Sequence, residues 1–272
     1  MPGDLTRPCD LEQFKGAHRL PTCPRSGSFR VSRTLVHLLR HGKVHNPKEI
    51  LYGRLPGYPL AASGRAMAAG VADFLSGSDI TYLAASSLQR AAQTAAPLAS
   101  AFGLDIATDD RIIEAANAFE GLAFGINRTL GNPRAWAKLR DPRTPSWGEP
   151  YLDIAHRMLA AIYTAVQAAE GHEAVLVSHQ LPIVTARRYL NGQRLWHDPR
   201  HRSCSVASLT TLSFTDGVYS GSSYREPVAY IAAVNDPDVE TFPAVPTPGV
   251  TTPAVPTPGV PTPGANASGA AG

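Results

Sequence analysis

The stretch Thr34 to Gly42, TLVHLLRHG, joins a short apolar run to the tripeptide Arg-His-Gly. A short apolar run that ends at a glycine is typical of a buried β-strand. In open α/β sheets, ligands bind beyond the carboxyl ends of the strands. Arg40 and His41 stand at such an end, so they are the first candidates for a functional site.

Polar clusters follow two further apolar runs in the same way. Ser86 to Arg90 comes after the predicted strand Ile80 to Ala85, and Ser178-His179-Gln180 comes after the predicted strand Ala174 to Val177. We therefore expect both clusters to share one rim of the sheet with His41. Two arginines and the start of a helix after the second cluster favour binding of an anion, most simply a phosphoryl group.

Helical patterns separate these runs and define the fold class. Apolar residues recur at helical spacing in Ser63 to Leu75, Leu88 to Phe102 and Tyr151 to Ala169. Pro97 lies inside the second pattern, where we expect it to kink the helix or to end its first half. Further strand candidates are Val206 to Phe214 and Val228 to Ala233. Strands that alternate with helices predict an α/β fold with a largely parallel sheet covered on both faces.

The ends of the chain differ from the middle in composition. Residues 1–32 mix Pro, Gly, Ser and charged residues without a period, and we interpret them as a loose arm. Residues 236–272 are rich in Pro, Thr, Ala and Gly, and PAVPTPGV occurs at both 243–250 and 253–260. This repeat has no apolar face to stack, so we expect a disordered tail with polyproline-II character. The single folded domain is predicted to span residues 33–235.

Composition excludes several classes of protein. Of 272 residues, 43% are hydrophobic and 17% charged, and the net charge is only +3, so charge predicts neither a nucleic-acid nor a membrane partner. No apolar run is long enough for a transmembrane helix, and residues 1–30 lack a continuous apolar h-region, so we expect neither a transmembrane helix nor a secretory signal. The cysteines Cys9, Cys23 and Cys204 are odd in number and widely spaced, which favours reduced thiols. We expect a cytoplasmic protein.

His41 has three interpretations at this point. In a helix, His37, His41 and His45 would form a metal-binding face, but Gly42 and Pro47 oppose a long helix. His41 could also be a hydrogen-bonded residue at a strand end. The interpretation we favour is a catalytic imidazole beside an arginine.

Six motifs resemble the histidine phosphatase (phosphoglycerate mutase-like) superfamily, in order along the chain. The motifs are LLRHG (38–42), GYPLAASG (57–64), SSLQRAAQTA (86–95), RIIEAANAFEG (111–121), PSWGEPYLDIAHR (145–157) and VSHQ (177–180). The resemblance covers about residues 34–214 and leaves out both ends. It implies a three-layer α/β/α sandwich with a mostly parallel, mixed sheet.

The resemblance also implies roles for the matching residues. It implies that His41 is the nucleophile that becomes a phosphohistidine, and that Glu114 donates a proton to the leaving oxygen. The residues implied to hold the phosphoryl oxygens are Arg40, Arg90 and His179. The residues implied to contact phosphate or substrate are Asn46, Tyr52 and Gly53.

The chain departs from the family pattern at several positions. Lys43 stands where an acidic residue commonly follows the first glycine, and the spacing from His41 to Asn46 is about one residue shorter than in the mutases. Gln180 stands where a glycine commonly follows the second histidine, so its amide either enters the phosphate pocket or fills space. The spacing from Glu114 to Glu120 is about one residue shorter than in the mutases, which makes Glu120 a reserve candidate for the acid. The alternative for Glu120 is a loop carboxylate that caps a turn.

The implied activity is hydrolysis of a small phosphorylated metabolite, without a metal or cofactor because Arg and His supply the positive charge. The alternatives are a phosphoglycerate-type mutase and a non-catalytic phosphate-binding module. Mutases of this family carry a longer insertion after the acid motif, and only 26 residues separate Gly121 from Gly148 here. Hydrolysis is therefore favoured. The sequence identifies no partner beyond this substrate, and it leaves open both a homodimer and a partner for the tail.

Two aromatic-basic clusters lie near the motifs. One is predicted to cap the site and contains Arg134, Trp136, Arg140 and Arg143; the other contains Trp196, His197, Asp198, Arg200, His201 and Arg202. Each either selects an acidic or sugar-like leaving group or consists of solvated side chains around a packed tryptophan.

Overall fold

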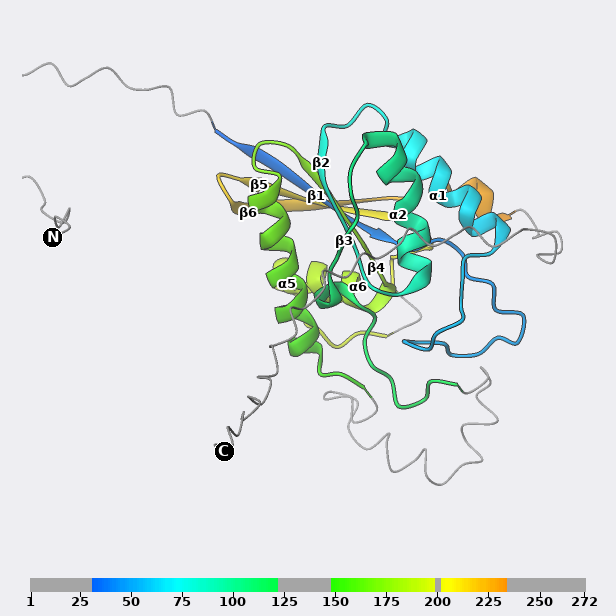
Figure 1. Cartoon of the computed structure of the whole chain (residues 1–272). Helices are drawn as coiled ribbons and strands as arrows, with labels where there is room; N and C mark the ends of the chain where they lie inside the picture. Colours follow the sequence, from blue (N-terminus) through cyan, green and yellow to red (C-terminus); the bar gives the residue numbers. More distant parts are fainter. Residues whose placement is uncertain (1–30, 122–147, 199–201, 234–272) are drawn as a thin grey trace, which may run out of the picture. The chain divides into compact units, whose positions relative to one another are not determined.

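The apolar run that opens the folded part of the chain forms strand β1 (Arg33–Arg40). This strand lies inside a six-stranded sheet in a computed structural model that describes residues 31–121, 148–198 and 202–233 (Figure 1). All described residues belong to one compact unit, Met1–Pro237.

The sheet has the strand order β3-β2-β4-β1-β5-β6. Strands β2 (Ile80–Ala85), β3 (Ala107–Thr108) and β4 (Glu173–Ser178) run parallel to β1. Strand β5 (Leu209–Thr215) pairs antiparallel with β1, and β6 (Val218–Arg225) pairs antiparallel with β5 at the edge of the sheet. The sheet is therefore mixed and mostly parallel, as predicted.

Helices cover both faces of this sheet, which completes the three-layer sandwich (Figure 1). The helices are α1 (Ala62–Phe74), α2 (Gln89–Phe102), α5 (Tyr151–Ala168) and α6 (Gln180–Leu190). Val36 and Leu38 of β1 pack in the core with α5 and α6, whereas Leu39 packs in the core with α1 and α2. Burial on both faces explains why the apolar residues of β1 do not alternate strictly with polar ones.

One expectation about secondary structure is wrong, and one of the two alternatives at Pro97 does not occur. The run Val228 to Ala233 is not a strand; all of it after Val228 forms the 3₁₀ helix η3 (Ala229–Ala233). Val228 and Ile231, three residues apart, pack against α1 at Gly70, and this spacing places both on one face of a 3₁₀ turn. Helix α2 continues through Pro97 instead of ending there, because its buried face runs on to Leu98.

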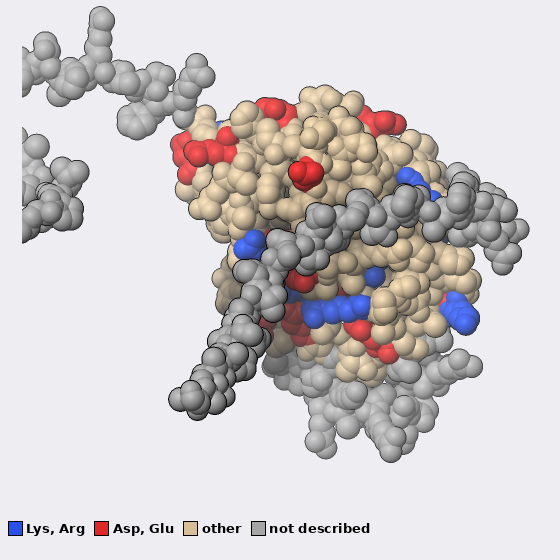
Figure 2. Space-filling model, viewed as in Figure 1, with Lys and Arg blue, Asp and Glu red and all other residues tan. Residues whose placement is uncertain are grey.

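Basic and acidic side chains are scattered among other residues on the face drawn in Figure 2. Within the described ranges, no helix has the length and apolar character needed to cross a bilayer. Several predicted features lie outside the described residues: the arm, the tail, Cys9, Cys23, the cap residues Arg134, Trp136, Arg140 and Arg143, and also Arg200 and His201.

Candidate active site

Strands β1 and β4 end level with each other, and this brings two histidines together. Arg40 is the register partner of Ser178, and the backbone N–H of His41 donates to the carbonyl oxygen of Ser178 at 3.1 Å. The next residue after Ser178 is His179, whose ring centroid lies 5.1 Å from that of His41. Both imidazoles are buried.

Strand β2 ends at the same edge and adds Ser86. Its backbone N–H donates to Val177 at 3.1 Å, and its hydroxyl oxygen lies 2.6 Å from Nε2 of His179. Nδ1 of His179 is buried and has no hydrogen-bond partner among the described residues. The rim predicted from three strand ends therefore exists, and Ser86 fixes the orientation of the second histidine.

Two arginines lie next to this pair of histidines. Arg40 donates through Nη1 to the carbonyl oxygen of Cys204 at 2.6 Å. Arg90, in the first turn of α2, donates through Nη2 to the carbonyl oxygen of Gly53 at 2.7 Å and lies 4.8 Å from the ring centroid of Tyr52. Among the described residues neither arginine pairs with a carboxylate, and the Nε atom of each is buried without a partner. A site with two such cations is suited to an anion.

The chemistry of His41 follows from its hydrogen bond and its surroundings. Nδ1 lies 2.8 Å from the carbonyl oxygen of Gly42. Because a carbonyl only accepts, Nδ1 must carry a proton. Burial lowers the pKa of His41 well below its ordinary value, and the charges of Arg40 and Arg90 lower it further, so the ring is neutral. Nε2 therefore carries a lone pair, which makes no hydrogen bond within the described part of the chain.

Glu114 reaches the cavity from a loop that follows a short helix. It follows the 3₁₀ helix η1 (Asp110–Ile112), and its Oε1 accepts a hydrogen bond from the backbone N–H of Ala115 at 2.9 Å. Burial raises the pKa of Glu114, although this hydrogen bond and the charges of Arg90 and Arg40 act in the opposite direction. A carboxyl group in this environment holds a proton more readily than one in water.

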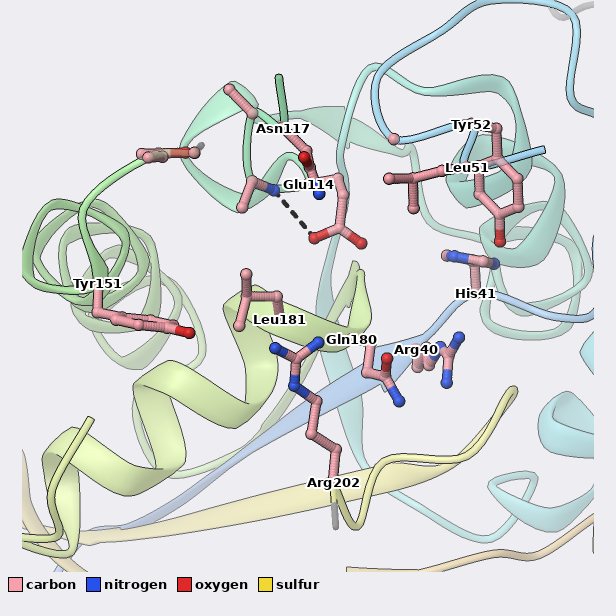
Figure 3. A pocket seen from close by; sticks show the side chains of 15 residues that line it. Arg40, His41, Leu51, Tyr52, Glu114, Asn117, Tyr151, Gln180, Leu181 and Arg202 are labelled. Carbon is pink, nitrogen blue, oxygen red and sulfur yellow. Dashed lines mark hydrogen bonds between the residues drawn. The ribbon is translucent and has the colours of Figure 1, made fainter. Parts of the chain in front are cut away.

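These groups meet at a cavity of about 530 Å³ (Figure 3). The predicted site residues that line it are Arg40, His41, Tyr52, Gly53, Glu114 and Gln180. Arg90 and His179 are not in its wall but pack against Tyr52 and His41, respectively. The amide nitrogen of Gln180 lies 3.4 Å from the carbonyl oxygen of Cys204, which also accepts from Arg40.

Two further candidates, Asn46 and Glu120, also lie outside the cavity wall. Asn46 uses both ends of its amide on the backbone of Ile50, at 2.8 and 3.1 Å, and so holds its own loop together. Glu120 accepts a hydrogen bond from the backbone N–H of Asn117 at 3.2 Å and so caps a turn. It also packs against Gly53, where a Cβ atom would come within 2.2 Å of its carboxylate oxygen.

The sequence did not reveal the network that fixes the loop before and after Glu114. Glu149 is held by Arg54 at 2.9 Å and by Arg157 at 2.7 and 3.1 Å. The two arginines also donate to backbone carbonyls: Arg54 to Glu114 at 2.6 Å, and Arg157 to Arg111 and Ile113 at 2.6 and 2.7 Å. Glu149 and Arg157 belong to the fifth motif, but nothing in the sequence shows with which residues they pair.

Two glycines from different motifs bring backbones into close contact beside His41. A Cβ atom on Gly42 would lie 2.5 Å from the carbonyl oxygen of Gly64, and one on Gly64 would lie 2.0 Å from the carbonyl oxygen of Lys43. Any side chain at either position would therefore displace the segment that carries His41. This close contact explains why the first two motifs each end in a glycine.

The arrangement of three histidines for a metal does not form, because His37 lies in a strand. Its Nδ1 lies 2.8 Å from the hydroxyl of Thr211, and its Nε2 lies 2.8 Å from the carboxylate of Glu173. Among the residues that the structure describes, no group of three His, Cys, Asp or Glu side chains is arranged to hold a metal ion.

Several residues of the cavity wall were not singled out as site residues from the sequence. They are Leu51, Ala115, Ala116, Asn117, Gly148, Glu149, Tyr151, Leu181 and Arg202. Of these, Arg202 was included only in the second aromatic-basic cluster. Arg202 lies seven residues before β5, which starts at the edge where β1 ends. That position was the signal that could have identified it.

Comparisons with known proteins agree with this geometry. The sequence profile of the histidine phosphatase superfamily (branch 1) matches residues 36–226. The uncharacterized protein Rv0525 of Mycobacterium tuberculosis (strain ATCC 25618 / H37Rv) is 53% identical over 197 residues, which cover 72% of this chain and 98% of that protein. A probable phosphoglycerate mutase GpmB of Escherichia fergusonii is 29% identical over 180 residues, covering 63% of this chain and 82% of that protein.

A solved structure extends the comparison to three dimensions. The native structure of mycobacterial glucosyl-3-phosphoglycerate phosphatase Rv2419c is 28% identical, with a TM-score of 0.55. It covers 68% of this chain and 91% of the other.

Proposed function

Because the chain belongs to the histidine phosphatase superfamily (branch 1), we propose that it hydrolyses a small phosphomonoester through a phosphohistidine on His41. The observation that carries this proposal is the hydrogen bond between Nδ1 of His41 and the carbonyl oxygen of Gly42. It fixes the proton on Nδ1 and leaves the lone pair on Nε2 for attack on phosphorus.

In the first step, Nε2 of His41 forms a bond to phosphorus as the ester P–O bond breaks. The charges of Arg40 and Arg90 stabilise the oxygens of the transferring group, which is the main requirement of phosphoryl transfer. The lowered pKa of His41 keeps the nucleophile neutral beside these cations. The pKa of His179 is lowered by burial and by the charges of Arg90 and Arg40, so its neutral ring donates an N–H to an oxygen of this group without adding a full charge.

Glu114 supplies the proton that the leaving oxygen needs. An alkoxide is a poor leaving group near neutral pH, so a positioned acid contributes about 10²- to 10⁴-fold. The raised pKa of Glu114 favours its protonated form. In the second step, water attacks phosphorus, the P–N bond breaks to release phosphate, and the Glu114 carboxylate takes the proton from water.

The size of the cavity supports a small phosphorylated metabolite as substrate. Its volume of about 530 Å³ lies in the range of small-molecule pockets, about 300–1,000 Å³. The solved relative at 28% identity is described as a glucosyl-3-phosphoglycerate phosphatase, which supports hydrolysis over mutase chemistry. The side chains present supply the positive charge, so no metal is required in this proposal.

Screening a panel of phosphorylated metabolites with wild type and His41→Ala tests the proposal. We expect release of phosphate by wild type and a loss of about 10³-fold or more in the variant. His172→Ala is the matched control, because this histidine is exposed and pairs with Asp79 away from the cavity. Quenched wild type should carry a phosphoryl group on His41; turnover by His41→Ala at the wild-type rate would refute the mechanism.

A phosphoglycerate mutase is the second candidate, because the 29% identical relative is described as a probable mutase of this kind. The two activities differ in whether the phosphoryl group goes to water or back to the substrate. Conversion of 2-phosphoglycerate to 3-phosphoglycerate, measured together with release of free phosphate, distinguishes them. Interconversion that exceeds phosphate release would favour the mutase.

A further inference from the structure

We propose that Arg202 forms a second anion-binding subsite in the cavity, which selects phosphomonoesters that carry another negatively charged group. This inference rests on the proposed function, because it concerns the part of the substrate that the phosphoryl pocket does not hold. Figure 3 shows the guanidinium group of Arg202 pointing into the cavity between Leu181 and Gln180, with Tyr151 and His41 on opposite sides.

A neutral partner, His197, holds the Arg202 side chain in place. Its Nε donates to Nε2 of His197 at 2.9 Å, and Nδ1 of His197 lies 2.6 Å from the carbonyl oxygen of Leu195. An arginine only donates and a carbonyl only accepts, so His197 must carry its single proton on Nδ1 and be neutral. Tyr151 lines the cavity wall beside the guanidinium group. His197 therefore orients the arginine without neutralising it.

The charge of Arg202 lacks a carboxylate partner within the described residues. Burial lowers the pKa of Arg202, which means that its charge is partly removed from water. The other arginines near this wall differ: Arg54 and Arg157 both pair with the carboxylate of Glu149. A desolvated, oriented and unpaired cation in a cavity wall is stabilised by an anion that the ligand brings.

The chemistry of the subsite defines the class of ligand. The planar fork of an arginine binds a carboxylate or a phosphoryl group with two parallel hydrogen bonds. The amide of Gln180 offers a further polar contact, and Leu51 and Leu181 give the cavity apolar wall for a short carbon skeleton. The substrate class is thus a small phosphomonoester with a carboxylate or a second phosphoryl group.

Binding to the full chain with His41→Ala, which prevents turnover, tests the subsite by calorimetry. The first pair of probes is 3-phosphoglycerate and glycerol 3-phosphate, which differ by a carboxylate in place of a hydroxymethyl group. The second pair is propane-1,3-diyl bisphosphate and 3-hydroxypropyl phosphate. In at least one pair we expect the probe with the second anion to bind about 10- to 100-fold more tightly, as for a hydrogen bond to a charged group. The pair that shows the difference identifies the anion.

Adding Arg202→Gln should remove this difference. Arg225→Gln is the matched control, because it removes the same charge from an exposed position on β6 and should preserve the difference. Equal affinities within both pairs, or equal weakening of both members by Arg202→Gln, would overturn the subsite. Absence of turnover by wild type would refute the proposed function instead, and the binding comparison would still decide on Arg202.

The positioning role of His197 has its own test. His197→Leu cannot accept the hydrogen bond from Arg202, so the ratio of affinities within the selective pair should fall about 3- to 10-fold. His197→Gln offers a carbonyl oxygen near the position of Nε2 and should restore most of that ratio. Equal ratios in the two variants, at equal melting temperatures, would exclude His197 from this role.

Discussion

Arg157 forms a two-point salt bridge with Glu149, with 2.7 Å between Nε and Oε1 and 3.1 Å between Nη2 and Oε2. Its remaining nitrogen, Nη1, donates to the carbonyl oxygens of Arg111 and Ile113. One side chain thus ties helix α5 to the backbone that leads into Glu114. The position of the proposed acid depends on this contact.

We expect Arg157→Met to lower both stability and activity. It leaves Glu149 partly buried without its main partner and two carbonyls without donors, which should cost about 2–3 kcal/mol of unfolding free energy. Displacement of Glu114 should lower kcat for alkyl phosphates about 10- to 100-fold. Denaturant titration and kinetics measure the two effects. The control is Arg225→Met, which removes an arginine from an exposed position on β6 and should change neither quantity appreciably.

Glu114→Gln should affect substrates according to their leaving groups. An alkyl or sugar phosphate needs a proton on the leaving oxygen, so its kcat/KM should fall about 10²- to 10⁴-fold. Nitrophenolate leaves without help, so formation of the phosphohistidine from 4-nitrophenyl phosphate should slow much less. Rapid-quench kinetics should show a burst of nitrophenolate followed by slow turnover. Equal losses on both substrates without a burst would assign the acid role to another residue, with Glu120 tested next.

The raised pKa of Glu114 predicts how stability depends on pH. The folded protein keeps this proton to higher pH than the unfolded chain, so stability is lost as the pH rises above the ordinary carboxyl value of about 4.3. Glu114→Gln removes this penalty. Its melting temperature should exceed that of wild type at pH 7 and approach it near pH 4. A variant that is less stable than wild type at pH 7 would contradict this sign.

Gly64→Ala should disturb the site through the backbone. Its Cβ atom would lie 2.0 Å from the carbonyl oxygen of Lys43, so the segment that carries His41 must move. We expect a loss of about 1–3 kcal/mol in stability and about 10²-fold in kcat/KM. Gly77→Ala is the control, since no atom lies within 4 Å of its added Cβ, and it should change neither quantity appreciably. Equal behaviour of the two variants would show that the close contact is unimportant.

Turnover should survive an excess of EDTA. Arg40 and Arg90 supply the positive charge for the transferring group in the proposed mechanism, so a chelator removes nothing that the reaction needs. Rates with and without EDTA, and after addition of zinc or magnesium, measure this. Loss of activity that a divalent ion restores would require a metal-dependent mechanism.

The strands inside the sheet could be predicted from the sequence, but its edge strand β6 could not. β1, β2 and β4 are short apolar runs buried on both faces, and such runs are recognisable without knowledge of their neighbours. β6 was missed because its sequence, VYSGSSYR, is mostly polar and exposed, and its pairing with β5 gives no apolar pattern. The run at Val228 was misassigned because its apolar residues serve contacts with α1, which the sequence does not show.

The candidate site divides in a similar way. His41 and His179 could be placed together because both follow strands that end at one edge of the sheet. The pairing of Arg54 with Glu149 joins residues 95 positions apart, and no local pattern encodes it. Likewise, the orientation of Arg202 depends on a histidine tautomer that only the hydrogen bonds reveal.

The central place of β1 also has a consequence for folding. His37 of this strand bonds to Glu173 and Thr211, which lie 136 and 174 residues further along the chain. Contacts between such distant residues raise the contact order, which slows folding and exposes unpaired strands to aggregation. During synthesis β1 therefore emerges before the other described strands, yet it gains its second neighbour only when β5 has left the ribosome. Of the described strands, β1 is therefore the first to be synthesised, but it has both neighbouring strands only after β5 has been synthesised.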